Sequence, residues 1–414
     1  MIERRLLERI VRDVIAHHHD TLPDELAAAM AASGYAQRTP IGLAIGKAAL
    51  AMARAFGPVE RGLIVSPHDD REGVPEGWQL LVSSHPIVDE RAVVAGDAAI
   101  ELVERAPADR VVVALISGGA SALVESPLVP LAEFVGITSA LARLGAPIAE
   151  VNTVRIALSA IKGGELAARS AAPVVTLVVS DVIDDSLEVI GSGLTVGPWL
   201  RPNGQTVDHA ARRATQRKHA LRVLRPRGLT IPAVLSEPLE PTPPATRSDF
   251  ARVVVPMQRL SRTVRAALVS RAAIAIRWSQ TPLVQDVREV ARHLGREIPA
   301  MVFWGEPTLV LPPDHGSGGR MQQLALELAS LFAGTNRSAL AIGTDGMDGP
   351  APVGRPAPAG AYIDGTTWDA IRAAGIDPQA ALDRRDAGTA LAAVGALVIT
   401  GPTGVNHADL VVIG

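Results

Sequence analysis

The segment RVVVALISGGAS at residues 110–121 decides the fold class of this chain. Its run of Val, Ala, Leu and Ile has no polar position, so both faces of the expected strand must be buried. Such strands occur in parallel sheets that helices cover on both sides. The strand ends in two glycines flanked by Ser117 and Ser121. Open parallel sheets bind ligands at the carboxyl ends of their strands, so this turn is a candidate binding site.

Strands and helices alternate on both sides of this segment. Further buried strands are expected at residues 41–45, 62–66, 79–83 and 173–180, with helices between them. This alternation predicts a Rossmann-like, doubly wound α/β/α domain. A proline-rich stretch then separates a second α/β pattern, whose first strand lies near Val253. We therefore predict an N-terminal domain, a linker and a smaller C-terminal α/β domain, over residues 1–236, 237–248 and 249–414.

Composition excludes several classes of protein. A chain of 414 residues that is 48% hydrophobic can bury two cores. Its net charge of −3 gives no electrostatic case for nucleic acid or an anionic membrane. Because it has no cysteine, disulfides, thiolate metal sites and cysteine catalysis are excluded. No signal-peptide core or membrane-spanning run is recognisable, so we expect a cytoplasmic protein.

Three consecutive histidines at residues 17–19 form the first motif that invites a functional interpretation. Neighbouring imidazoles could bind a metal ion. A water-exposed helix end is the better interpretation of the triplet.

Lysine occurs at only three positions, and arginine supplies every other basic side chain. Lys47 follows a strand and a glycine, where a helix should begin. A helix N-terminus with an added cation suits a phosphate or a carboxylate, although a surface lysine is the simpler alternative. The Walker motif is excluded, because only three residues separate Gly42 from Gly46 and Ala48 follows the lysine.

Two further groups of polar residues lie in the N-terminal half. On a continuous helix, Arg155, Ser159 and Lys162 would share one face, which would bind an anion or simply face water. Asp181 and Asp185 follow a buried strand, with Asp184 between them. Crowded carboxylates at a strand end can hold Mg²⁺ or orient a hydroxyl, or form a plain loop.

The C-terminal half repeats the pattern of strands followed by polar, glycine-rich turns. Arg320 begins a helix after a glycine-rich loop and could clamp a phosphate or carboxylate. Other turns contain Glu306, Asp345 and the sequence TGPTGVN at residues 400–406. Turns rich in Gly, Ser, Thr, Asp and single cations suit phosphoryl transfer, which requires two anionic partners to be positioned and developing charge to be neutralised.

These residues together resemble the class II glycerate 2-kinases, which carry a C-terminal MOFRL domain and were in part once labelled hydroxypyruvate reductases. The matching motifs follow one another in the family's order from about residue 41 to the C-terminus. They are GKAA at 46–49, SHP at 84–86, SGGASAL at 117–123, NTVR at 152–155, IKGG at 161–164, SDV at 180–182, IGSG at 190–193, GSGGR at 316–320, GTDGMDGP at 343–350 and TGPTGVNHADL at 400–410.

The resemblance implies two α/β domains, an active site in the cleft between them, and transfer of phosphate from ATP, with Mg²⁺, to the 2-hydroxyl of D-glycerate. It implies catalytic roles for Lys47, Arg320, Asp185 and Asp345, and a magnesium site on Asp181 and Asp185. The general base stays open among the three aspartates. The implied binding residues are Ser117, Gly118, Gly119, Ser121, Asn152, Arg155, Lys162, Ser192, Gly193, Glu306, Thr400, Thr403 and Asn406.

The chain departs from the family pattern in several turns, for example at Ile156-Ala157, where Lys-His is usual, and at Leu194, where Pro is usual. These departures concern the substrate more than the fold. An NAD(P)-dependent hydroxypyruvate reductase is the first alternative, but residues 42–47 lack the dinucleotide fingerprint. A non-catalytic binding protein on the same scaffold is the second. The oligomeric state stays open, with a homodimer as one option.

Overall fold

A computed structural model describes the chain except for residues 1, 197–208, 238–248, 297 and 350–355. It divides into two compact units. We call residues Thr21–Pro256 the N-terminal unit. The C-terminal unit combines Met1–Asp20 with Met257–Gly414.

The N-terminal unit is built on a six-stranded sheet in which every neighbouring pair is parallel. The strand order is β3-β2-β1-β4-β5-β6, which is that of a doubly wound fold. This confirms the predicted Rossmann-like architecture and places the reversal of strand order between β1 and β4. The strands are β1 Pro40–Ile45, β2 Arg61–Ser66, β3 Trp78–Val82, β4 Val111–Ile116, β5 Val174–Val179 and β6 Phe250–Val255.

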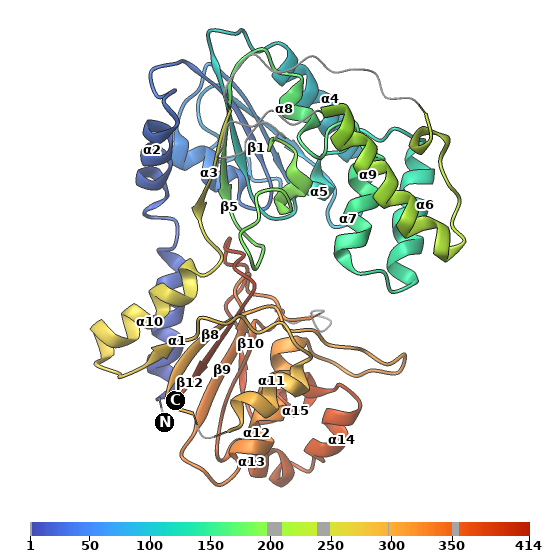
Figure 1. The fold of residues 1–414 in the computed structure, drawn as a ribbon. Helices are drawn as coiled ribbons and strands as arrows, with labels where there is room; N and C mark the ends of the chain where they lie inside the picture. The colour runs from blue at the N-terminus through green and yellow to red at the C-terminus, as the bar shows by residue number, and fades with distance from the viewer. Residues whose placement is uncertain (1, 197–208, 238–248, 297, 350–355) are drawn as a thin grey trace. The chain divides into compact units, whose positions relative to one another are not determined.

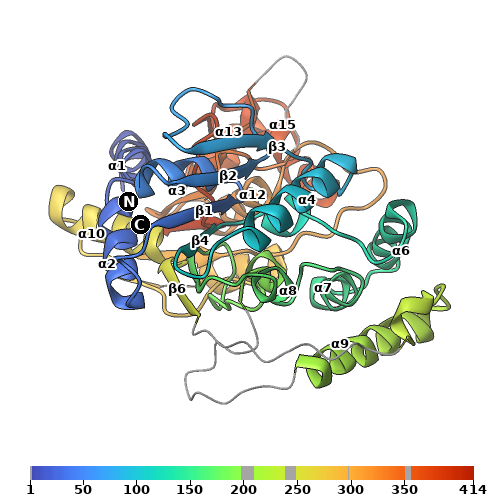
Figure 2. The same cartoon turned by 90° about the horizontal axis from the view of Figure 1, so that it is seen from above.

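Helices cover both faces of this sheet, as Figure 1 and Figure 2 show. Apolar side chains of α2 (Leu22–Ser33) and α3 (Ala49–Phe56) pack on one face. The other face is covered by α4 (Glu90–Glu104), α5 (Ala120–Leu123) and α8 (Glu165–Ala168). The central strands are therefore buried on both sides, as their apolar sequences require.

Three more helices form a separate apolar cluster beside these layers. They are α6 (Leu131–Arg143), α7 (Ile148–Ala157) and α9 (His209–Leu224). The continuous helix considered for Arg155, Ser159 and Lys162 is wrong, since α7 and α8 are distinct. Helix α9 was not predicted, because its polar sequence shows little apolar periodicity.

The C-terminal unit contains a mixed sheet in the order β11-β10-β9-β12-β8-β7. Its neighbouring strands are antiparallel except for β7 and β8. Strand β10 was not predicted. The strands are β7 Arg277–Trp278, β8 Met301–Gly305, β9 Ser338–Gly343, β10 Gly360–Asp364, β11 Leu397–Val398 and β12 Asp409–Ile413.

Helices cover both faces of this second sheet as well. One face packs against α1 (Arg4–Ala16) and α10 (Arg259–Ala272). The helices on the other face are α11 Val287–Leu294, α12 Arg320–Phe332, α13 Thr367–Ala373, α14 Pro378–Asp383 and α15 Ala387–Ala393.

The division of the chain differs from the predicted boundaries at two places. Helix α1 belongs to the C-terminal unit, because its apolar side chains, including Leu7 and Val11, pack with α10 and the second sheet. Strand β6, expected to open the second domain, pairs with β5 and completes the first sheet. Apart from Glu237, the predicted linker lies outside the described residues. A periodic pattern of apolar residues shows that a helix or strand is buried, but it does not identify the element against which that helix or strand packs.

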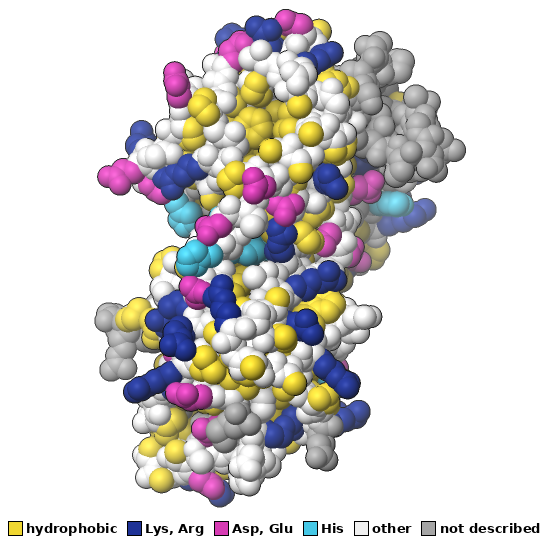
Figure 3. Space-filling view, turned by 90° about the vertical axis from the view of Figure 1, so that its left-hand side faces the viewer, with side chains coloured by type: hydrophobic (Ala, Val, Ile, Leu, Met, Phe, Trp, Pro, Cys, Tyr) yellow, Lys and Arg dark blue, Asp and Glu magenta, His cyan; other side chains and the backbone are white. Residues whose placement is uncertain are grey.

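None of the described helices is long and apolar enough to cross a membrane. On the face shown in Figure 3, basic and acidic side chains lie interspersed among uncharged ones. That mixture is typical of a surface that faces water.

One of the three N-terminal histidines is turned into the C-terminal unit, so the interpretation as a water-exposed helix end is wrong for His18. Its Nε2 lies 2.8 Å from Nε2 of His407, which is only 3% exposed. Nδ1 of His407 lies 3.2 Å from the carbonyl oxygen of Met257. A carbonyl can only accept, so His407 donates through Nδ1, and in the neutral ring its Nε2 accepts a hydrogen from His18. Burial lowers the pKa of His18 to about 2 and that of His407 to about 4.

We expect the C-terminal unit to lose stability as the pH falls below 6.5. Both histidines have a pKa below 6.5 in the folded state, so the unfolded chain binds more protons there, and protonation favours unfolding. Between about pH 7.5 and about pH 5 the pair should lose roughly 2 to 4 kcal/mol of unfolding free energy, measured by urea unfolding with tryptophan fluorescence. His18→Gln should reduce this loss, while the exposed His17→Gln should not. Equal losses in the wild type and His18→Gln would contradict the assignment.

Candidate functional site

The turns after β1 and β4 meet at the point where the strand order reverses. The backbone N–H of Lys47 donates to the carbonyl oxygen of Gly118 at 2.9 Å. The N–H of Ala48 donates to Oγ of Ser117 at 3.0 Å. The first two predicted turns therefore form one structure, at the position where doubly wound sheets bind ligands. Ser117 is 2% exposed and supports the turn from below.

Two glycines at this turn are required by the side chains that crowd it. A Cβ on Gly118 would lie 2.1 Å from Oδ2 of Asp181, which follows β5. A Cβ on Gly119, where φ is 84°, would lie 3.0 Å from Cδ2 of His85 and 3.4 Å from Cγ of Lys47. Side chains from the ends of β1, β3 and β5 thus converge on the turn after β4.

The turn after β4 has two side chains beside it that can interact with a ligand, those of Lys47 and His85. Within the described residues, the ammonium group of Lys47 has neither an ion pair nor a hydrogen bond, although its side chain is half-buried. Beside it, partial burial lowers the pKa of His85, and the charges of Lys47 and His68 lower it further. The turn therefore offers a free cation and a neutral imidazole. His85 was quoted above only as part of a motif, and the signal that could have found it is its position directly after a predicted strand.

Ser192 and Gly193, which were predicted as binding residues, lie next to α5, the short helix that follows the turn after β4. Oγ of Ser121 on α5 lies 2.8 Å from Oγ of Ser192. Ser192 belongs to the 3₁₀ turn Ile190–Gly193, which packs against α5. Its carbonyl oxygen accepts from the N–H of Gly163 at 2.9 Å. The structure thus brings Ser121, Ser192 and Gly193 together.

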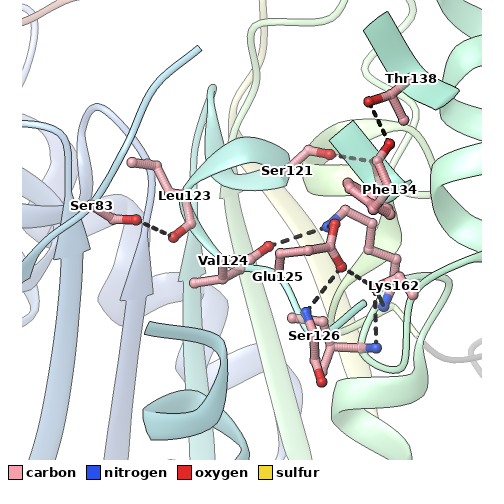
Figure 4. A network of polar contacts seen from close by, with 12 residues as sticks. Ser83, Ser121, Leu123, Val124, Glu125, Ser126, Phe134, Thr138 and Lys162 are labelled. Carbon is pink, nitrogen blue, oxygen red and sulfur yellow. Dashed lines mark hydrogen bonds and ion pairs between the residues drawn. The ribbon is translucent and has the colours of Figure 1, made fainter. Parts of the chain in front are cut away.

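The predicted cationic helix face is wrong, because α7 ends at Ala157 before Ser159 and Lys162. Lys162 is fully buried, with Nζ 2.5 Å from Oε2 of Glu125 and 3.2 Å from the carbonyl oxygen of Val124 (Figure 4). Ser159 donates to Oε1 of Glu125 at 2.5 Å. Burial lowers the pKa of Lys162, and the charge of Glu125 opposes that shift. Lys162 therefore supports the fold around α5. Glu125 was not predicted, although a glutamate after the apolar Leu123-Val124 could have suggested a buried ion pair.

Arg155 remains a candidate anion-binding residue, although the helix face predicted for it does not exist. It lies on α7 one turn after Asn152, and both side chains are half-buried. Nε of Arg155 is buried and has no hydrogen-bond partner among the described residues. Burial lowers the pKa of Arg155, and the charge of Glu125 opposes that shift. A half-buried guanidinium whose Nε has no hydrogen-bond partner can bind an anion.

The predicted magnesium ligands Asp181 and Asp185 both lie in the segment that follows β5. Across the described parts of the chain, no group of three or more acidic or histidine side chains could hold a metal ion. Asp185 has a positive φ of 52°, and its N–H donates to the carbonyl oxygen of Val182 within the loop after β5.

In the C-terminal unit, Arg320 lies among acidic side chains at the start of α12. Its Nη1 lies 2.8 Å from Oε1 of Glu306, and its Nη2 lies 3.4 Å from Oδ2 of Asp409. Asp409 is 4% exposed, and its Oδ2 has no hydrogen-bond partner among the described residues. Burial raises the pKa of Asp409 well above its usual value, Arg320 opposes this shift, and the neighbouring Asp348 and Glu306 add to it. Asp409 belongs to the motif at residues 400–410, but no role was predicted for it.

The N-terminus of α12 is already occupied. Asp348 accepts from the N–H groups of Met321 at 2.9 Å and Gln322 at 2.7 Å. A second anion at these amides would meet the charge of Asp348. Any anion bound here must therefore contact the Arg320 side chain rather than the end of the helix.

The remaining predicted residues of this unit form one pair of interlocked turns. Oγ1 of Thr403 donates to the carbonyl oxygen of Thr344 at 2.6 Å, and its N–H donates to that of Asp345 at 3.2 Å. Thr400 also borders this turn, since a Cβ on Gly346 would lie 2.9 Å from its Oγ1. Asn406 is half-buried in the same loop.

A cavity of about 580 Å³ lies beside the glycine-rich loop that precedes α12. Its size falls within the range of small-molecule sites. The lining residues are Ser317, Gly318, Gln322, Pro356, Pro358, Gly388, Thr389, Ala392, Gly395, Leu397 and Ile399.

Comparison with known proteins identifies the family to which this chain belongs. Residues 2–224 match the domain of unknown function DUF4147, and residues 299–409 match the MOFRL family. D-glycerate 2-kinase of Thermotoga maritima is 34% identical over 392 residues, 89% of each chain, and glycerate 2-kinase of Pyrococcus horikoshii is 31% identical, over 89% of this chain and 86% of that protein. The crystal structure of glycerate kinase from Thermotoga maritima superposes with a TM-score of 0.80, at 30% identity over 99% of both chains. The chain therefore belongs to the glycerate 2-kinase family, with a DUF4147 domain followed by a MOFRL domain.

Proposed function

We propose that this chain is an ATP-dependent kinase that phosphorylates the 2-hydroxyl of D-glycerate, or of a closely related small hydroxy acid. The observation that carries the proposal is the unpaired ammonium of Lys47 at the point where the strand order reverses. It occurs in a chain that matches glycerate 2-kinases over nearly nine-tenths of its length. Doubly wound folds bind ligands at this position, and a free cation there suits an anionic substrate.

Phosphoryl transfer requires positive charge around the transferring group, and each unit can supply it. We assign Lys47 and Arg155 in the N-terminal unit and Arg320 in the C-terminal unit to the anionic groups of the two substrates. Gly118 and Gly119 let a phosphate or carboxylate approach the backbone. We expect Mg²⁺ to enter with the nucleotide as MgATP, with Asp181 and Asp185 as its proposed protein ligands.

The other predicted residues fall into three groups under this proposal. Those that line the turns are assigned to substrate binding, namely Ser121, Asn152, Ser192, Gly193, Glu306, Thr400, Thr403 and Asn406. Ser117 and Lys162 have partners inside the fold and support these turns. Asp185 and Asp345 keep their proposed catalytic roles, with Asp181 as a further candidate for the proton acceptor.

We expect ADP release that depends on a hydroxy acid, with D-glycerate turned over faster than L-glycerate, glycolate or D-lactate. A coupled ADP assay measures the rates, and ³¹P NMR of the product should show phosphate on the 2-oxygen. No turnover of any acid in this panel would contradict the proposal. Oxidation of NADH with hydroxypyruvate would favour a reductase, and a ligand-induced thermal shift without turnover would favour a binding protein.

A further inference from the structure

His85 lies beside the turn that holds Gly118 and Gly119, and the proposed kinase reaction assigns it no role. Its position is fixed by its neighbours, because Oγ of Ser83 donates to the carbonyl oxygen of Leu123 at 2.6 Å, and Oγ of Ser84 accepts from the N–H of Asp89 at 3.1 Å. These bonds tie the segment after β3 to α5 and to the start of α4.

The ring of His85 faces the turn with one edge. A Cβ on Gly119 would lie 3.0 Å from Cδ2 and 3.1 Å from Nε2 of the ring. The residue as a whole is exposed, and neither ring nitrogen has a hydrogen bond within the described part of the chain. Nε2 is therefore next to the glycines that a substrate would approach and is free to interact with it.

The surroundings keep this ring neutral at neutral pH. Lys47 faces it from the turn after β1 and His68 from the loop after β2, and partial burial acts in the same direction as their charges. The carboxylate of Asp181 lies against the adjacent Gly118. A neutral imidazole beside a bound hydroxy acid can accept a proton, which an imidazolium cannot.

We propose that His85, in place of the three candidate aspartates, accepts the proton of the substrate hydroxyl during phosphoryl transfer, which leaves the aspartates to bind the metal or to orient the hydroxyl. The hydroxyl O–H bond breaks as its oxygen bonds to the γ-phosphorus, and the bond from that phosphorus to the β-phosphate oxygen breaks, which releases ADP. The proton moves to His85 Nε2 and then to solvent, since Lys47 disfavours a lasting imidazolium. This inference rests on the proposed kinase function.

The test compares the wild type with His85→Gln, whose side chain cannot accept this proton. We expect kcat to fall about 10²- to 10³-fold, and the KM for D-glycerate to change far less. The ratio of wild-type to variant kcat/KM should fall as the pH drops below 6.5, because only the wild type then loses its base. Titration of ATP affects both proteins and cancels in this ratio. Imidazole added to His85→Ala should restore part of the activity, and more of it at higher pH.

His68→Gln serves as the matched control and should stay within about threefold of the wild type, with its acidic limb shifted slightly upward because one positive charge near His85 is gone. A ratio that does not change between about pH 5.5 and about pH 8 would overturn the inference. So would a variant in which only KM changes, or His85→Ala without imidazole rescue. If the wild type turns over no hydroxy acid, the proposed function itself fails, and this is visible before any variant is made.

Discussion

Replacing Lys47 with methionine should lower kcat for D-glycerate about 10³-fold while the fold is retained. The expected loss is that of one preorganised positive group on a developing negative charge. Methionine keeps the length of the side chain, and Lys47 has no partner in the described residues that its removal would leave unpaired. Lys218→Met on α9 is the matched control, because that lysine is exposed, and it should have wild-type kinetics.

Measuring kcat of Arg320→Gln in the same way tests whether Lys47 of one unit and Arg320 of the other contribute to the same phosphoryl transfer. We expect Arg320→Gln to lower kcat to a similar degree. If Lys47 and Arg320 neutralise the same transferring phosphate, the double variant should lose much less than the product of the two single losses. Strict multiplication of the two losses would indicate separate steps. A Lys47→Met enzyme with kcat within threefold of the wild type would refute the proposed anion site.

Prediction from the sequence succeeded best where the local residue pattern alone determines where a segment lies in the fold. Residues 111–116 are apolar throughout, and a strand with no polar position has few alternatives to the centre of a parallel sheet. The turn that follows it lies where the strand order reverses, so the positions of Gly118, Gly119 and Lys47 in the fold could be predicted, and their binding roles stay a proposal.

Prediction failed where a residue's role depends on a partner far away in sequence. The spacing of Arg155, Ser159 and Lys162 predicted a shared helix face, but α7 ends at Ala157 and Lys162 pairs with Glu125, 37 residues earlier. His18 likewise pairs with His407, 389 residues away. The periodicity of apolar residues in the sequence indicates that a side chain is buried, but it does not identify the residue with which that side chain interacts.

Glu125→Gln should lower the unfolding free energy of the N-terminal unit by about 3 to 5 kcal/mol, because it leaves the fully buried ammonium of Lys162 without its counter-charge. Urea unfolding measures the loss. Glu104→Gln is the matched control, since its ion pair with Arg169 is 2.7 Å long but exposed to water. That change should lower stability by at most about 1 kcal/mol.

A double variant separates the charge from the packing at this buried pair. Glu125→Gln combined with Lys162→Met removes both charges and keeps similar side-chain volumes, so it should recover much of the lost stability. Its kcat then decides what the pair contributes to the reaction. The pair joins residues 159–162 to Glu125, two residues after the end of α5. Helix α5 carries Ser121 and follows the turn that holds Gly118 and Gly119. A stable double variant with reduced kcat would mean that the ion pair positions α5, whereas full activity would restrict its role to stability. If Glu125→Gln lowers stability no more than Glu104→Gln, the buried pair is not held as described.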